Sequence, residues 1–251
     1  MALIIHHLAV DGVSWRTLIE DINIAWAQHR SGQEIALPVP GTSFGRWSSI
    51  LAEYAKSPAV VAAAGAWQQL VATPAVLPAV GPDDTYASAG QLSASLDVQT
   101  TRLLLGEVPA AFHAGVQDIL LIALGLACTE FVGRGAPIGI DVEGHGRHEE
   151  IASGVDLSRT VGWFTHESIL RRCASARLSW GQVVGGDEAL GAVVKEAKEQ
   201  LRALPDGLTY GLLRYLNPRS GLCRVSDPAI AFNYLGRLGR GPPSSHPSCG
   251  G

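Results

Sequence analysis

Two short segments of the chain carry side chains that could move protons. The first is His6-His7-Leu8-Ala9-Val10-Asp11-Gly12, where two imidazoles precede an acidic residue and a glycine. An imidazole titrates near neutral pH, so His7 could act as a general base. Asp11, four residues later, could orient the ring, cap a helix or pair with a buried arginine. A core histidine beside a capping aspartate is the alternative, but the paired histidines at this spacing favour a functional role.

The second segment is Asp141-Val142-Glu143-Gly144-His145-Gly146-Arg147. Glu143 could donate or accept a proton, and Arg147 could orient it. The two glycines would let the backbone approach another element closely. A solvated loop with two charges explains this segment equally well when it is taken alone.

A metal site is a further alternative for the histidine-containing segments. No HExxH pattern is present, and His148-Glu149-Glu150 does not match a zinc-protease motif. We therefore expect no metal. The sequence also contains no phosphate-binding loop, GxSxG nucleophile motif or dinucleotide fingerprint. The side chains that this metal alternative would use are His6, His7, Asp11, His145 and His148.

Both segments are expected to follow buried strands. Residues 2–5 and 138–142 are short apolar runs, each ending where the polar residues begin. After the first run, apolar residues at three- and four-residue steps predict a helix that starts near Asp11 or Ser14. His7 would then lie near a helix N-terminus, which stabilises negative charge on a substrate.

The remaining pattern alternates helices and strands, which indicates an α/β protein. Periodicity predicts helices around residues 44–54, 59–71, 98–105, 116–132 and 190–204, and strands at 91–96 and 229–235. The 116–132 helix is apolar almost all round and should be buried. All six tryptophans are expected in the core. A proline-rich linker is predicted at 76–87 and a disordered tail at 238–251.

Composition limits the function classes. The 251 residues are 47% hydrophobic and 17% charged, with a net charge of −4, which is typical of a globular protein without a nucleic-acid or membrane partner. The longest apolar run, residues 119–128, is too short to span a bilayer. Four cysteines without CxxC pairing favour a reducing, cytoplasmic setting.

Five segments in order resemble motifs of the condensation-domain superfamily of nonribosomal peptide synthetases, and most closely its epimerization branch. The VGWFT and FNYLG forms favour epimerization over plain condensation. Residues 6–16 resemble HHLxVDGVSWR, 141–147 contain EGHGR, 156–165 resemble DxSRTVGWFT, 205–216 resemble PDxGxxYGLLRYL, and 231–236 contain FNYLG.

The resemblance implies a chloramphenicol-acetyltransferase-like fold with two lobes and a tunnel between them. A peptidyl carrier protein would deliver the substrate on its phosphopantetheine arm, and neighbouring synthetase domains would be further partners. No cofactor would be bound by the domain itself. His7 and Glu143 would be the two acid–base groups. The supporting residues would be His6, Asp11 and Arg147, together with Asn233 and Tyr234 near the substrate.

The sequence also departs from the family pattern. The family's domain begins well before the paired histidines, so residues 1–75 are expected to be the remnant of a truncated first lobe and 88–237 the second lobe. The family has a strand between Thr165 and Asp187, but residues 166–175 lack strand alternation, and residues 166–181 are expected to loop out of the sheet. The expected activity is epimerization of a carrier-bound aminoacyl or peptidyl thioester, impaired in this chain. Peptide-bond condensation and a silent, carrier-docking remnant are the alternatives.

Overall fold

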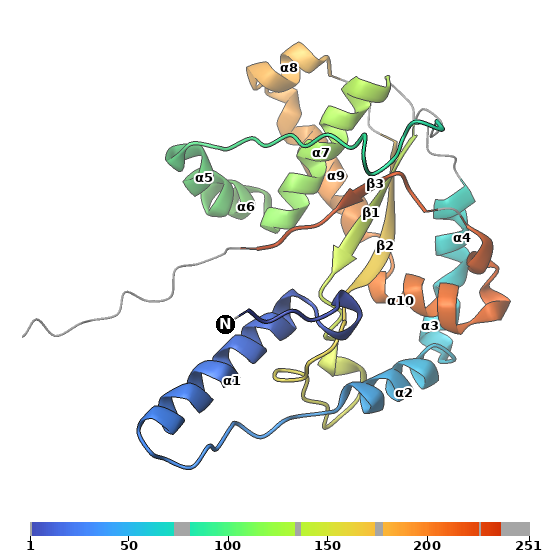
Figure 1. Ribbon diagram of the computed structural model, residues 1–251. Helices are drawn as coiled ribbons and strands as arrows, with labels where there is room; N and C mark the ends of the chain where they lie inside the picture. Colours follow the sequence, from blue (N-terminus) through green and yellow to red (C-terminus); the bar gives the residue numbers. More distant parts are fainter. Residues whose placement is uncertain (1, 73–80, 134–136, 174–177, 226, 237–251) are drawn as a thin grey trace, which may run out of the picture.

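A three-stranded sheet lies at the centre of the computed structural model, which describes residues 2–72, 81–133, 137–173, 178–225 and 227–236 (Figure 1). Strand β1 (Pro137–Gly144) lies between β2 (His166–Cys173) and β3 (Ile230–Phe232). It pairs antiparallel with β2 and parallel with β3. The mixed sheet and its surrounding helices confirm the predicted α/β class.

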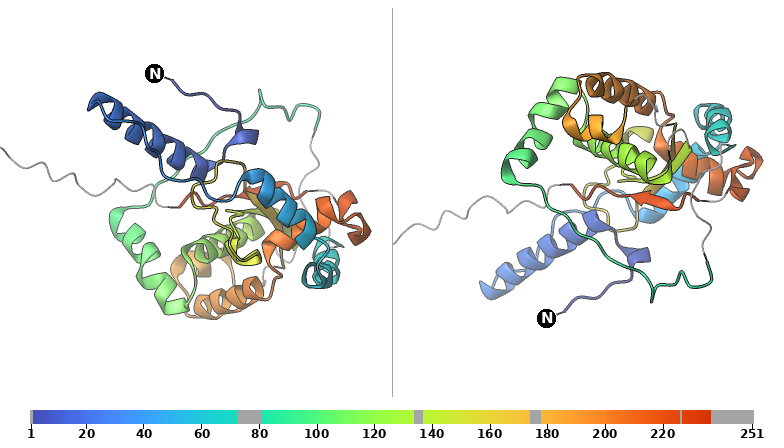
Figure 2. Two further views of the ribbon diagram at one scale, coloured as in Figure 1. Left: turned by 90° about the horizontal axis from the view of Figure 1, so that it is seen from below. Right: turned by 90° about the horizontal axis from the view of Figure 1, so that it is seen from above.

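The two faces of β1 have different roles because side chains alternate along a strand. Ile138 and Ile140 are buried against Leu121 of α7 (Val116–Val132) and Leu170 of β2. Helix α9 (Ala189–Arg202) covers the same face. Figure 2 shows α1 and the α7–α9 pair on opposite sides of the molecule. The residues that alternate with the isoleucines, including Glu143, therefore lie on the face away from α7 and α9.

A second hydrophobic core covers that other face of the sheet. Ile169 of β2 packs there with Trp67 of α4 (Ala64–Ala72) and with Leu208 and Tyr210 of α10 (Gly207–Gly211). The Trp67 indole donates a hydrogen bond to the Thr209 hydroxyl at 2.9 Å, which pairs the polar atom of a fully buried ring. This core fixes α4 and α10 against β2.

The predicted helices are confirmed, with one division. The segment expected as a single helix over 59–71 is two helices, α3 (Pro58–Ala62) and α4, with Ala63 between them. The other helices are α1 (Gly12–Arg30), α2 (Phe44–Tyr54), α5 (Val98–Leu105), α6 (Glu107–Phe112) and α8 (Trp180–Gly185), and the short turns are η1 (His7–Ala9), η2 (Glu149–Ile151), η3 (Leu212–Leu216), η4 (Pro218–Ser220) and η5 (Leu222–Arg224).

Two predicted strands are wrong. Residues 2–5 are extended but pair with none of the described strands, and Ile4 is 92% exposed. Residues 91–96 are also unpaired among the described residues, and Leu92 is 96% exposed. An apolar or alternating run becomes a strand only where a neighbouring strand completes its backbone hydrogen bonds. Neither segment lies beside such a partner in the described structure.

The expectation that residues 166–181 loop out of the sheet is wrong for residues 166–173. Residues 166–173 form β2, which pairs with β1 along its whole length. Ile169 and Leu170 are buried on opposite faces of the sheet, so the strand is covered on both sides there and has no alternating pattern. Helix α8 occupies residues 180–185.

Other expectations fall partly outside the described residues. Residues 81–87 of the proposed 76–87 linker form turns without helix or strand, whereas 76–80 and the proposed tail at 238–251 are not described. Of the tryptophans, Trp47 and Trp67 are buried as expected. Trp26, Trp163 and Trp180 are exposed, which contradicts a core position for all six.

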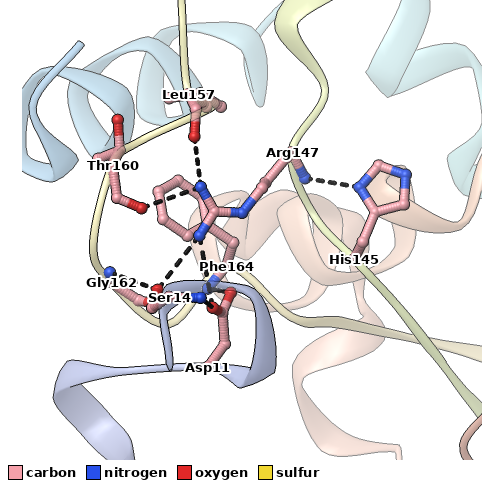
Figure 3. Close-up of polar contacts among 8 residues, drawn as sticks. All are labelled: Asp11, Ser14, His145, Arg147, Leu157, Thr160, Gly162 and Phe164. Carbon is pink, nitrogen blue, oxygen red and sulfur yellow. Dashed lines mark hydrogen bonds and ion pairs between the residues drawn. The ribbon is translucent and has the colours of Figure 1, made fainter. Parts of the chain in front are cut away.

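A buried ion pair joins the start of α1 to the loop between β1 and β2 (Figure 3). Asp11 caps α1: its Oδ1 accepts the Ser14 backbone N–H at 2.7 Å, and its Oδ2 accepts the Phe164 N–H at 3.2 Å. Arg147 donates from Nη2 to Asp11 Oδ1 at 3.4 Å and to Ser14 Oγ at 3.2 Å. The side chains of Asp11 and Arg147 are only 5% and 10% exposed.

Arg147 also holds the loop that contains residues 157–164. Its Nη1 donates to the carbonyl oxygens of Leu157 and Thr160, the latter at 2.9 Å, and its guanidinium lies 3.9 Å from the centre of the Phe164 ring. Ser14 Oγ completes the junction by exchanging hydrogen bonds with the Gly162 carbonyl at 2.8 Å and N–H at 3.0 Å. We call these contacts the Asp11–Arg147 clamp.

The clamp favours the ionised form of Asp11. Burial alone would raise the pKa of this carboxyl, but hydrogen bonds from Ser14 and Phe164 and the charge of Arg147 together lower it below its usual value. The clamp therefore stabilises the folded state above the ordinary pKa of an aspartate. This contribution is lost as the pH falls through the lowered pKa of the folded state.

Gly146 allows the backbone at Phe164 to approach the residue before Arg147 closely. Its φ is +68°, and a Cβ atom at this position would lie 1.6 Å from the Phe164 carbonyl oxygen. A side chain there would be strained in the left-handed region and would also push the Phe164 backbone away. The glycine expected to permit a close approach is confirmed in that role.

We predict that Arg147→Met lowers the free energy of unfolding by about 3 kcal/mol, because it leaves Asp11 buried without its ionic partner. Arg46→Met, at an exposed arginine of α2, should change it by less than about 0.5 kcal/mol. Urea unfolding of the natural polypeptide that carries these residues measures both. Equal losses for the two variants would contradict a stabilising clamp.

We predict that Gly146→Ala destabilises the fold by more than Gly154→Ala does. Gly154 has a similar φ of +75°, but a Cβ atom there would meet nothing within 4 Å. The Gly154 variant should therefore report backbone strain alone, about 1 kcal/mol, and the Gly146 variant at least about 2 kcal/mol. Thermal and urea unfolding of both variants give the difference. Equal values would show that the close approach to Phe164 costs nothing when disturbed.

Candidate active site

A cavity of about 700 Å³ lies between the start of α1, the end of β1 and the α10–η3 segment. His7 and Glu143, which are 136 positions apart in the sequence, both line it. Trp47, Leu51 and Leu208 supply apolar walls. A cavity of this size, with apolar walls and a few polar groups, is suited to a small organic ligand.

His7 reaches the cavity from a short turn and not from the end of a strand. It begins η1, whose first turn is capped by His6: the His6 Nδ1 accepts the Leu8 N–H at 3.1 Å. The ring centres of His7 and Trp163 are 4.8 Å apart, with the planes tilted by 53°. The turn and the indole together position the imidazole at the rim of the cavity, beside the N-terminus of α1.

Glu143 lies near the carboxyl end of β1, where the sequence predicted it. The Asn233 side-chain amide donates a hydrogen bond to Glu143 Oε2. Asn233 follows β3, and the parallel pairing of β3 with β1 brings it to this place. Burial raises the pKa of Glu143, the negative charge of Glu167 raises it further, and His7 acts in the opposite direction. The carboxyl therefore keeps its proton to a higher pH than an ordinary glutamate.

Asp141 forms a second acidic group on the same face of β1, two residues before Glu143. Burial raises its pKa to about 6, with further increases from the charges of Glu167, Asp227 and Glu143, whereas Arg214 lowers it. Its Oδ1 is buried and has no hydrogen-bond partner among the described residues. Asp141 is not among the residues that line the cavity, and its described link to the site is the charge of Glu143 and Glu167, which raises its pKa.

The structure brings together three of the residues predicted from the sequence: His7, Glu143 and Asn233 line one cavity. His6 stabilises the turn that carries His7. Tyr234 is described but is not one of the cavity-lining residues. The remaining two, Asp11 and Arg147, form the clamp beneath the site.

Sequence reasoning missed most of the side chains that line the cavity, among them Trp163, Glu167 and Tyr215. Trp163 was assigned to the core, although it lies inside the VGWFT segment and is 40% exposed. Glu167 lies in the segment that was expected to leave the sheet. Recognising β2 as the antiparallel partner of β1 would have placed Glu167 opposite Glu143.

Three further findings concern the described residues only. No group of three or more histidine, cysteine, aspartate or glutamate side chains is arranged there to hold a metal ion. His145 and His148 stack with ring centres 5.2 Å apart. No single described helix is long and apolar enough to cross a bilayer, although residues 98–112 and 116–132 meet that criterion as a pair bent by 95°.

Comparison with known proteins identifies the family of this chain. The condensation-domain family model matches residues 1–243. A linear gramicidin synthase polypeptide of Brevibacillus parabrevis is 42% identical over 248 residues, and chondramide synthase cmdD of Chondromyces crocatus is 41% identical over 245. These matches cover 95% and 94% of this chain but only 4% and 6% of the two synthases.

The fold is similar to solved structures. The epimerization domain from the third module of tyrocidine synthetase B is 35% identical, with a TM-score of 0.77 over 92% of this chain and 51% of that one. The first condensation domain of the calcium-dependent antibiotic synthetase has the same fold at 16% identity, with a TM-score of 0.60 over 91% of this chain and 46% of that one. The family predicted from the motifs is confirmed: this chain belongs to the condensation domain family and has its α/β fold.

Proposed function

We propose that this chain epimerises the α-carbon of an aminoacyl or peptidyl thioester in nonribosomal peptide synthesis. The observation that carries the proposal is the shared cavity of His7 and Glu143, an imidazole and a protonation-prone carboxyl from distant parts of the chain. The similarity to an epimerization domain at 35% identity supports it. The cytoplasmic setting expected from the sequence belongs to the same proposal.

Epimerization needs one group to remove a proton and another to return it on the opposite face. A neutral His7 would take the α-proton, leaving an enolate-like anion conjugated with the thioester carbonyl. A protonated Glu143 would then deliver its proton to the other face of the same carbon. The reverse direction exchanges the two roles. The substrate regains one proton for the one that it loses, and the catalytic pair is reset when His7 gives its proton to solvent and Glu143 takes one from solvent.

The developing negative charge requires stabilisation at the carbonyl oxygen. Gly12, the first residue of α1, lines the cavity, so the positive end of that helix dipole faces the site. Asp11 caps the helix but accepts only the Ser14 N–H of the first turn. In this proposal, the remaining N–H groups of the turn are directed toward the substrate anion.

A carrier protein would present the substrate on its phosphopantetheine arm, with neighbouring synthetase domains supplying the carrier. The membership in the condensation domain family and the similarity to synthases support these partners. The arm is part of the substrate in this scheme, and the apolar walls formed by Phe44 and Leu51 fit its hydrocarbon portions.

Peptide-bond condensation is the second candidate, because the matching family model is that of the condensation domain. In that reaction His7 would assist an attacking amine, and no proton would be exchanged at the α-carbon. A silent domain that only docks a carrier would catalyse neither reaction.

We predict that the natural polypeptide carrying these residues exchanges the α-proton of a carrier-bound aminoacyl thioester for deuterium in heavy water. Mass spectrometry of the released amino acid measures the label, and chiral chromatography measures the D-isomer. Formation of a dipeptide with a second loaded carrier, without label at the α-carbon, would establish condensation instead. Neither product, with retained carrier binding, would establish the silent alternative.

We predict that His7→Ala and Glu143→Gln each lower the rate of exchange by about 10²- to 10⁴-fold, the usual contribution of a positioned acid–base group. His6→Ala is the matched control: its ring caps η1 at the cavity's edge but does not line the cavity. It should reduce stability more than catalysis. An equal or larger catalytic loss in a well-folded His6 variant would contradict the assignment of His7.

A further inference from the structure

Glu143 has a second glutamate directly opposite it in the sheet. In the antiparallel register of β1 and β2, Glu143 pairs with Glu167 and Asp141 pairs with Ile169. Side chains directly opposite each other in such a pair lie on the same face, with Cβ atoms about 4.5–5.5 Å apart. Glu143 and Glu167 both line the cavity, so the two carboxyls face the same space.

Two like charges directly across a strand pair destabilise a sheet. No described residue forms an ion pair or hydrogen bond with the Glu167 carboxylate to offset this cost. Its described electrostatic neighbours are the acidic groups of Glu143, Asp141 and Tyr215, each of whose pKa it raises. The negative charge of Glu167 destabilises the sheet and lies beside a proposed catalytic carboxyl. A role in catalysis explains this charge more simply than a role in folding does.

The other groups near Glu143 come from four elements. Among the described residues, the imidazole of His7 in η1 is the group that lowers the pKa of Glu143, and the Asn233 amide after β3 donates a hydrogen bond to the Glu143 carboxyl. Asp141 lies on β1 itself. Arg214 of η3 is close to Asp141, but its ion pair is with Asp227. The described surroundings of Glu143 therefore hold more negative than positive charge.

Resting on the proposed function, we propose that Glu167 is a positioning residue that makes the Glu143–Glu167 pair hold one proton in common, so that Glu143 remains a competent proton donor. Two adjacent carboxyls cannot both ionise readily, so the second proton is held more tightly than by either group alone. Glu167 does not touch the reacting carbon in this scheme. It acts through the charge that it presents to Glu143.

The coupling can be measured without any activity. The full chain is labelled with ¹³C at glutamate carboxyls, and the Glu143 signal is identified by its loss in Glu143→Gln. In Glu167→Gln the titration midpoint of Glu143 should fall by about half to one pH unit, because a neighbouring negative charge has been removed. Glu167→Asp keeps the charge and should leave the midpoint near that of the unchanged protein. Glu34→Gln, at an exposed glutamate beyond the end of α1, is the charge-matched control and should leave it unchanged.

The rate of α-proton exchange gives the second readout. The decline in rate at high pH, where the donor loses its proton, should shift to lower pH in Glu167→Gln, with a rate about three- to tenfold lower on the high-pH side of the profile and little changed on the plateau below it. Glu167→Asp should restore the profile. A merely structural role for Glu167 would lower the rate equally at every pH.

The two proposals fail in different ways. An unchanged Glu143 midpoint in Glu167→Gln, or an equal shift in Glu167→Asp, would overturn the shared proton even if the protein exchanges α-protons. A clear shift of the midpoint in a protein that never exchanges α-protons would support the shared proton and overturn epimerization. A pH-independent loss of rate in Glu167→Gln would overturn the positioning role.

Discussion

The Asp11–Arg147 clamp is the interaction on which the geometry of the site depends. His7 lies four residues before Asp11, and Glu143 lies four residues before Arg147, so the ion pair joins the two segments that carry the proposed acid and base. The guanidinium binds backbone carbonyls of the loop between β1 and β2 at the same time. One buried cation thus fixes the helix start, the strand end and that loop relative to one another.

The clamp fixes the positions of the site residues, and the sheet in addition sets their electrostatic surroundings. β1 places Asp141 and Glu143 on one face, and β2 adds Glu167 opposite Glu143. Burial and mutual repulsion raise the pKa of Glu143, and they raise that of Asp141 to about 6. An ordinary surface would relieve such repulsion with a nearby lysine or arginine. Here the described arginine that acts on Asp141 is already bound to Asp227, so the face stays acidic beneath a cavity bordered by His7.

The sequence predicted the parts of this arrangement that depend on local chemistry. The helix starting after Asp11, the strand leading to Glu143 and the glycine needed beside Phe164 all follow from residue type and spacing. The predictions were wrong where strand formation depends on a partner that is distant in the sequence. Residues 2–5 and 91–96 were predicted as strands but lack a neighbouring strand in the described structure. Residues 166–173 were predicted to leave the sheet but pair with β1. Glu167 was missed for the same reason, because only the register places it opposite Glu143.

The shortness of β3 has a consequence for how the site moves. The strand has three residues, all paired with β1, yet this short ladder positions Asn233 against Glu143. Short strands at the edge of a sheet open locally at a much lower free energy than the core of a fold. Opening of β3 would release the amide from the carboxyl and withdraw Ile230 and Phe232 from the core beside α7, while the clamp and the core around Trp67 stay intact. The site can therefore fluctuate between a tethered and an untethered carboxyl without global unfolding, and substrate binding would select between these substates.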